Sequence, residues 1–144
     1  SLCKQTGLPQ GKVLPSPLVE FYLKNDELGD PLLTSDRLLL LELASPQQLE
    51  EIETMTRQIN QHLTDFFQRC GIILVDFKLE FGLDSKQKLL LADEISPDTC
   101  RLWNSQETDP QERVMDKDRF RRDLGKIESA YERVKERVLA QIAQ

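Results

Sequence analysis

The sequence predicts an α+β domain in which helices flank an antiparallel sheet. Three observations support this prediction. A long amphipathic segment with helix-capping residues occupies positions 45–70. An alternating segment at 72–82 is followed by a second one at 88–94, as in a hairpin. Two further amphipathic segments, at 116–124 and 126–143, close the chain as helices.

Composition limits the possible classes of protein. The chain has 144 residues, enough for one domain or a piece of one. Its hydrophobic fraction of 39% and charged fraction of 31% are typical of a globular chain. No apolar run approaches the roughly 20 residues that span a bilayer, so we expect no membrane association. The formal net charge of -6 argues against a nucleic-acid partner.

The cysteines and the single histidine exclude several kinds of site. Cys3, Cys70 and Cys100 stand far apart and form no CxxC pair. This spacing predicts a reducing compartment, and hence a cytoplasmic location, without a disulfide framework or a structural zinc site. His62 is the only histidine, which excludes a multi-histidine metal site and a histidine-based triad within this chain.

The N-terminal 17 residues are predicted to be an irregular lead-in to a domain that covers residues 18–144. Five glycines and prolines interrupt this lead-in. Residues 19–23 predict a short strand, and residues 29–31 predict a turn. Residues 37–44 fit a helix and a buried strand equally well. The chain begins with Ser1 instead of Met, which leaves processing, a cloning scar and a fragment as alternatives.

The helix at 45–70 has clear start and stop signals. Ser45 is predicted as its N-cap, Pro46 as its first residue and Gly71 as its C-terminal stop. Its apolar residues recur every three or four positions, which predicts a face packed on the core. They are Leu49, Ile52, Met55 or Thr56, Ile59, Leu63, Phe66 and Cys70.

Charged residues form a ladder along the strand predicted at 72–82. From Asp76 onward the strand alternates, so Asp76, Lys78 and Glu80 share one face at intervals of about 7 Å. A symmetric hairpin turn places Lys78 opposite Asp93 and Glu80 opposite Leu91, which gathers three carboxylates around one lysine. Such oxygen ligands suit Mg²⁺. A register slip of one residue turns Asp93 to the other face.

The alternative to a ligand site is a solvated sheet face whose cross-strand ion pairs contribute little. Two features favour the site. The flanking residues 72–75 and 89–92 are too apolar for an open face, and residues 93–103 leave the strand end rich in polar groups, as a ligand-binding rim does. Lys117 and Arg121 lie four apart on a predicted helix, a spacing that by itself is typical of a solvated helix face.

Four motifs, in the same order along the chain, closely resemble those of the SAICAR synthetase (phosphoribosylaminoimidazole-succinocarboxamide synthase) family. They are Phe21-Tyr22-Leu23-Lys24-Asn25-Asp26, Asp76-Phe77-Lys78-Leu79-Glu80-Phe81-Gly82, Asp93-Glu94-Ile95-Ser96-Pro97-Asp98 with Arg101-Leu102-Trp103, and Met115-Asp116-Lys117-Asp118-Arg119-Phe120-Arg121. The resemblance covers nearly the whole chain. It implies the C-terminal part of the family's fold, which is related to the ATP-grasp fold.

The resemblance also implies an activity. Members of this family are ligases of de novo purine biosynthesis that join L-aspartate to carboxyaminoimidazole ribonucleotide, using ATP and Mg²⁺, to give SAICAR, ADP and phosphate. It implies a homo-oligomer for the full-length protein. The family's N-terminal nucleotide-binding part has no counterpart in this sequence, so we expect the isolated chain to be inactive. A non-catalytic ribonucleotide-binding or structural fragment is the alternative.

The residue roles that follow come from matching family motifs. Glu80 and Asp93 match the carboxylates that bind Mg²⁺ and thereby ATP, Lys78 and Asp76 match the catalytic positions, and Lys24 matches a lysine on the nucleotide side. The substrate-binding positions are Ser1, Asp98, Arg101, Lys117 and Arg121. Asn104 stands where many members have Asp, and it is assigned no role.

Overall fold

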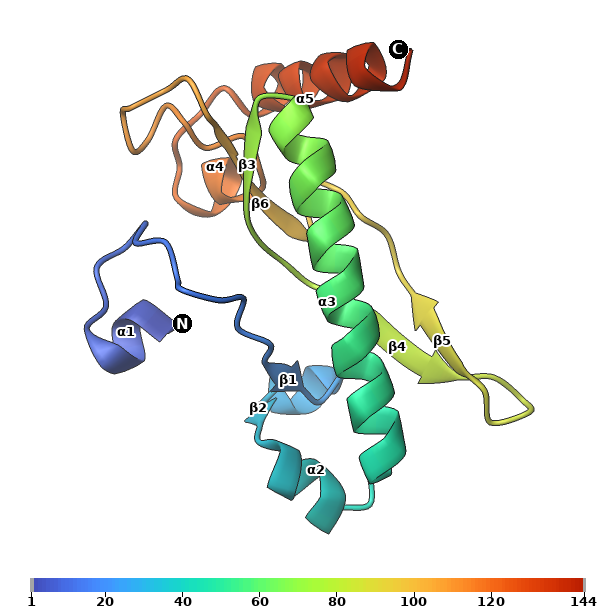
Figure 1. The fold of residues 1–144 in the computed structure, drawn as a ribbon. Coiled ribbons are helices and arrows are strands. Elements are labelled where there is room, and N and C mark those ends of the chain that lie inside the picture. Colours follow the sequence, from blue (N-terminus) through green and yellow to red (C-terminus); the bar gives the residue numbers. More distant parts are fainter. Residues whose placement is uncertain (1, 144) are drawn as a thin grey trace. The chain divides into compact units, whose positions relative to one another are not determined.

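The computed structural model describes residues 2–143, which form two compact units, one up to Glu53 and one from Thr54 (Figure 1). The division falls inside the long helix α3 (Pro46–Arg69). None of the helices in the described part of the chain is long and apolar enough to cross a membrane.

The first unit contains a small antiparallel ladder. β1 (Phe21–Tyr22) pairs with β2 (Leu32–Leu33), so the strand predicted at 19–23 is present but shorter. Between them the 3-10 helix η1 (Asp26–Leu28) begins at Asn25, whose side chain accepts the N–H of Leu28. Gly29 ends η1 in the left-handed region with φ 69°, within the turn predicted at 29–31.

Two helices of the first unit were not predicted. α1 (Leu2–Thr6) lies within the lead-in that we expected to be irregular, and Gly7 ends it with φ 73° and an N–H donated to Cys3. The segment at 37–44, which fitted helix or strand, contributes to α2 (Ser35–Leu40). Thr34 favours the helix over the strand, because its side chain accepts the N–H of Arg37 as an N-cap.

The start of α3 is a capping box. The Ser45 hydroxyl accepts the N–H of Gln48 at 3.1 Å, and the Gln48 side-chain oxygen accepts the N–H of Ser45 at 2.8 Å. Gly71, with φ 66°, follows the helix. The predicted N-cap, first residue and stop of this helix are therefore confirmed.

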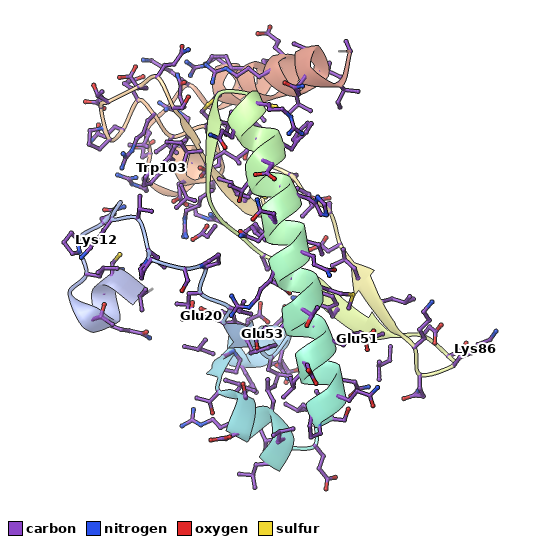
Figure 2. All side chains as sticks on the ribbon, viewed as in Figure 1. Lys12, Glu20, Glu51, Glu53, Lys86 and Trp103 are labelled. Atoms are coloured by element: carbon purple, nitrogen blue, oxygen red, sulfur yellow. The ribbon has the colours of Figure 1, made fainter. Side chains whose placement is uncertain are left out.

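The second unit contains two antiparallel ladders. β3 (Ile72–Phe77) pairs with β6 (Cys100–Asn104), and β4 (Glu80–Leu83) pairs with β5 (Leu89–Ala92), with Lys86 at the hairpin tip (Figure 2). The single strand predicted at 72–82 is wrong, because the chain changes partner at residues 78 and 79. Before that point it pairs with β6, a strand within the segment 93–103 that the sequence predicts to be a ligand-binding rim.

The core of the second unit lies between the C-terminal part of α3, the β3–β6 ladder and the helix α5 (Ile127–Ile142). Its buried members come from all of these elements and from the segment after β6. They are Phe67, Cys70, Ile72, Cys100, Leu102, Met115 and Val134. This core fixes β6 in place, and β6 carries one of the candidate site residues.

The predicted helix at 116–124 is wrong in length, because only α4 (Asp118–Arg121) is helical. The reason is Arg119, whose side chain is buried (1% exposed), so that the backbone on either side of α4 turns toward its guanidinium group. Its hydrogen-bond partners among the described residues are backbone carbonyl oxygens on both sides of α4. They belong to Gln111, Val114, Leu124 and Gly125.

We expect Arg119→Lys to lower the free energy of unfolding by about 3 kcal/mol, because one ammonium group cannot reach carbonyls on both sides of α4 and leaves buried acceptors unsatisfied. Urea denaturation measures this loss. Arg122→Lys is the matched control, since Arg122 is exposed in the same segment. Equal stability of the two variants would contradict this role of Arg119.

Candidate ligand-binding site

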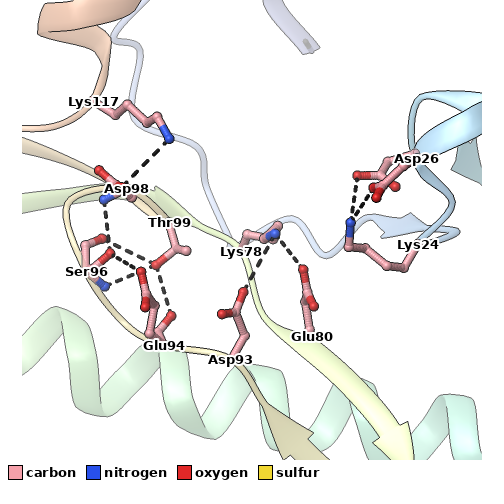
Figure 3. Close-up of polar contacts among 11 residues, drawn as sticks. Lys24, Asp26, Lys78, Glu80, Asp93, Glu94, Ser96, Asp98, Thr99 and Lys117 are labelled. Atoms are coloured by element: carbon pink, nitrogen blue, oxygen red, sulfur yellow. Dashed lines mark hydrogen bonds and ion pairs between the residues drawn. The ribbon is translucent and has the colours of Figure 1, made fainter.

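Lys78 lies where the chain passes from β3 to β4, and two carboxylates approach its ammonium group (Figure 3). Its Nζ atom is 2.6 Å from Glu80 Oε1 and 3.8 Å from Asp93 Oδ2. The Lys78 backbone N–H donates to the Thr99 carbonyl at 2.9 Å, which holds this crossing point against the segment before β6. The predicted proximity of Lys78, Glu80 and Asp93 is confirmed.

The hairpin register behind this proximity differs from the predicted one. Glu80 pairs with Ala92 instead of Leu91, a shift of one residue. Asp93 still reaches Lys78, because it lies beyond the end of β5 with φ 71° and no longer follows the strand's alternation. Asp is one of the few residues with a side chain that adopt this left-handed backbone readily.

Asp76 belongs to a different cluster, which corrects the expected group of three carboxylates. It lies opposite Arg101 in the β3–β6 ladder, and its Oδ2 atom is 2.6 Å from Arg101 Nη1. A register irregularity between Leu74 and Asp76 precedes this pair. Bulges of this kind re-aim the side chains that follow them. No group of three potential metal ligands occurs within residues 2–143.

Glu80 and Asp93 remain the residues that could hold a hard cation. Both are oxygen ligands that already converge on one positive group, the Lys78 ammonium. Mg²⁺ in proteins is commonly bound by one or two carboxylates, with waters and substrate phosphates completing its coordination. Two carboxylates therefore fit a metal site that is completed by a phosphorylated ligand.

Asp118 joins two arginines from different elements. Its Oδ2 atom accepts from Arg101 Nε, and its Oδ1 atom accepts from Arg121 Nη1, each at 2.9 Å. Burial raises the pKa of Asp118, but hydrogen bonds from Arg121 and Arg101 lower it by more, so it lies below its ordinary value. Burial lowers the pKa of Arg101, but Asp76 and Asp118 together hold it above its ordinary value.

Asp116 fixes the position of Asp118. It is completely buried, and its two oxygens accept the N–H groups of Leu102 at 2.7 Å and Asp118 at 2.8 Å. Burial raises its pKa, and the two backbone hydrogen bonds only partly offset this. Sequence reasoning assigned no role to Asp116 or Asp118. The signal was present, since both belong to the last family motif, from which only Lys117 and Arg121 were assigned roles.

Asp98 accepts one hydrogen bond and forms one ion pair within the second unit. Tyr131 of α5 donates its hydroxyl to Asp98 Oδ1 at 2.7 Å, and Lys117 Nζ lies 3.7 Å from Asp98 Oδ2. Lys117 and Arg121 therefore bind different carboxylates and do not act as one pair along a helix. Sequence reasoning missed Tyr131, because its place on the apolar side of α5 predicted only packing.

Lys24 lies in the first unit, where its Nζ atom is 2.7 Å from Asp26 Oδ1 and 3.8 Å from Asp30 Oδ2. Asp26 is the first residue of η1 and Asp30 follows its C-cap, so the lysine is held next to the turn between β1 and β2. Ser1, the other candidate from the N-terminal region, lies outside the described residues.

Comparison with known proteins assigns the chain to a family. The profile of SAICAR synthetase matches residues 1–138. The chain belongs to the SAICAR synthetase family. The phosphoribosylaminoimidazole-succinocarboxamide synthase of a Cyanothece species is 72% identical over 98% of this chain and 58% of its own length. The enzyme of the same name from Trichormus variabilis is 68% identical over 99% of this chain and 58% of its own length. The chain thus spans somewhat more than half the length of these relatives.

Solved structures of SAICAR synthetases share the fold. One, described as SAICAR synthetase (Type-2) in complex with ADP, has a TM-score of 0.87 and 45% identity over 95% of this chain and 57% of its own. Another, a SAICAR synthetase from Pyrococcus horikoshii OT3, has a TM-score of 0.87 and 45% identity over 96% of this chain and 59% of its own. The predicted α+β class, with helices beside antiparallel strands, is confirmed by this likeness and by the structure itself.

We expect Tyr131 to ionise well above the ordinary range of tyrosine. Burial raises its pKa, and the hydrogen bond to the Asp98 carboxylate raises it further. The raised pKa means that Tyr131 contributes stability below its ordinary pKa, which is lost as pH rises through the folded-state value. Absorbance titration to about pH 12 measures this: the signal should fall short of two phenolates, and Tyr131→Phe should leave it nearly unchanged, since the sequence has two tyrosines. Ionisation of both tyrosines near pH 10 in the unaltered chain would contradict it.

Proposed function

We propose that this chain forms the substrate- and metal-binding part, residues 18–144, of an ATP-dependent ligase. The reaction joins L-aspartate to carboxyaminoimidazole ribonucleotide and gives SAICAR, ADP and phosphate, as a step of purine biosynthesis. The curated relatives carry the name of this activity, and one structural neighbour is described with ADP. The proposal includes a cytoplasmic location and a homo-oligomer for the full-length protein.

The observation that carries the proposal is the pair of charged clusters in the second unit. One cluster joins Lys78 to Glu80 and Asp93, and the other joins Arg101 and Arg121 through Asp118. Transfer of a phosphoryl group mainly requires positioned cations along the phosphates, and acceptor substrates must be held in line. Two clusters of opposite composition, one open to a metal and one rich in arginine, suit these separate tasks.

In the first cluster, Glu80 and Asp93 would hold Mg²⁺ together with ATP. When bound, the metal supplies positive charge that offsets the phosphate oxygens. Lys78 is the proposed catalytic cation: with Glu80 and Asp93 engaged as metal ligands, its ammonium group would donate to a phosphate or carboxylate oxygen of the substrates. Lys24 is proposed to contact the nucleotide.

In the second cluster, the arginines would bind the ribonucleotide. Arg101 and Arg121 present planar groups of N–H donors, which match phosphate and carboxylate oxygens. Lys117 and Asp98 would contact the same substrate, with Ser1 as a further phosphate contact. Asp76 is proposed to act beside the reacting carboxylate, where it also orients Arg101 through their ion pair.

Replacing either proposed metal ligand, as in Glu80→Ala or Asp93→Ala, should abolish ATP-dependent formation of SAICAR. The loss is expected because the remaining carboxylate cannot hold the cation and its phosphates alone. The measurement is product formation by a protein of the relatives' full length that contains this chain. Glu136→Ala is the control, since Glu136 is exposed on α5. Normal turnover by both variants would reject the metal assignment.

Calorimetry on the 144-residue chain separates the ligase proposal from its alternative, a structural fragment. We expect heat of binding for carboxyaminoimidazole ribonucleotide and none for ATP, because the resemblance places much of the adenine pocket outside the portion of the family that this chain spans. The alternative is favoured by the limited coverage of the relatives, 58% of their length. A chain that binds neither compound would support it.

A further inference from the structure

Asp118 stands at the centre of an arrangement that the family resemblance did not assign. One carboxylate binds two guanidinium groups, one from β6 and one from the end of α4, through separate oxygen atoms. Arg101 Nε and Arg121 Nη1 are each 2.9 Å from their oxygen. Because like charges repel, two arginines are held near each other more easily when an anion lies between them.

The position of this carboxylate is itself fixed. The Asp118 side chain is only 17% exposed, and its backbone N–H donates to the completely buried Asp116. The other oxygen of Asp116 accepts the N–H of Leu102, the residue that follows Arg101 in β6. β6 and α4 are thus joined through one buried carboxylate.

The arginines keep donors available for a ligand. Arg101 uses Nε and Nη1 for Asp118 and Asp76, and Arg121 uses Nη1 for Asp118. Within residues 2–143, the Nη2 atoms of both arginines and Nε of Arg121 have no hydrogen-bond partner. The side chains are 43% and 49% exposed, respectively. Each guanidinium group is therefore fixed by some of its N–H groups and can donate to a ligand with the others.

We propose that Asp118 is a positioning residue that holds Arg101 and Arg121 ready to bind the phosphate group of the ribonucleotide. This role rests on the proposed function, and it explains what orients the two arginines toward the phosphate of the ribonucleotide. Asp118 acts through the arginines and does not itself touch the ligand. Its negative charge repels a phosphate, so a simple charge effect and a positioning effect have opposite signs, and binding measurements distinguish them.

The test compares Asp118→Asn with the control Asp123→Asn. Both changes remove one negative charge from the same segment, and Asp123 is exposed with φ 52°, a backbone that Asn adopts readily. Calorimetry on the 144-residue chain measures the Kd of carboxyaminoimidazole ribonucleotide and of the corresponding nucleoside without phosphate. We expect Asp118→Asn to weaken ribonucleotide binding about tenfold, with little change for the nucleoside. Asp123→Asn should change neither.

Asp118→Glu provides a second comparison that keeps the charge and moves the carboxylate. Weaker ribonucleotide binding in this variant supports positioning, since the net charge is unchanged. Ribonucleotide binding that is unchanged or tighter in both Asp118 variants would overturn the inference, as would an equal loss for ribonucleotide and nucleoside. Absence of binding by the unaltered chain contradicts the proposed function and this inference together, so the two failures are distinguishable.

Discussion

The buried carboxylate of Asp116 is the contact on which the arginine cluster of the candidate site depends. It receives one N–H from β6 and one from the first residue of α4, and in this way joins a strand of the core to a segment that would otherwise be a loop. Burial raises its pKa, so keeping it charged costs free energy that its two hydrogen bonds partly offset. Arg101 precedes Leu102 in the chain and Asp118 carries the second N–H group, and the side chains of Arg101 and Asp118 form a hydrogen bond.

Each cation proposed for ligand binding in the second unit already has a carboxylate partner. Lys78 pairs with Glu80, Lys117 with Asp98, and the two arginines share Asp118. Partly exposed ion pairs of this kind contribute little to stability. Their consequence is orientation: the cations are held in one arrangement, and the phosphorylated ligand that we propose would have to bind in that arrangement.

Backbone conformation sets which side chains meet in this unit. Asp93 leaves β5 with a left-handed backbone and reaches Lys78, although the hairpin register would have turned a regular strand residue away. An irregularity before Asp76 directs that carboxylate to Arg101. Lys78 lies between these two local features, where β3 ends its pairing with β6 and the hairpin begins. The site is thus built where two ladders meet.

The sequence by itself determined the α+β class, the capped helix from Ser45 to Gly71 and the hairpin after Lys78. These depend on local signals: caps, periodicity and turn residues act over a few positions. Only the tertiary structure decided that Asp76 pairs with Arg101, that α4 is one turn long and that Asp118 binds two arginines. Those contacts join residues up to 25 positions apart, and they are selected by core packing and buried hydrogen bonds that no short pattern encodes.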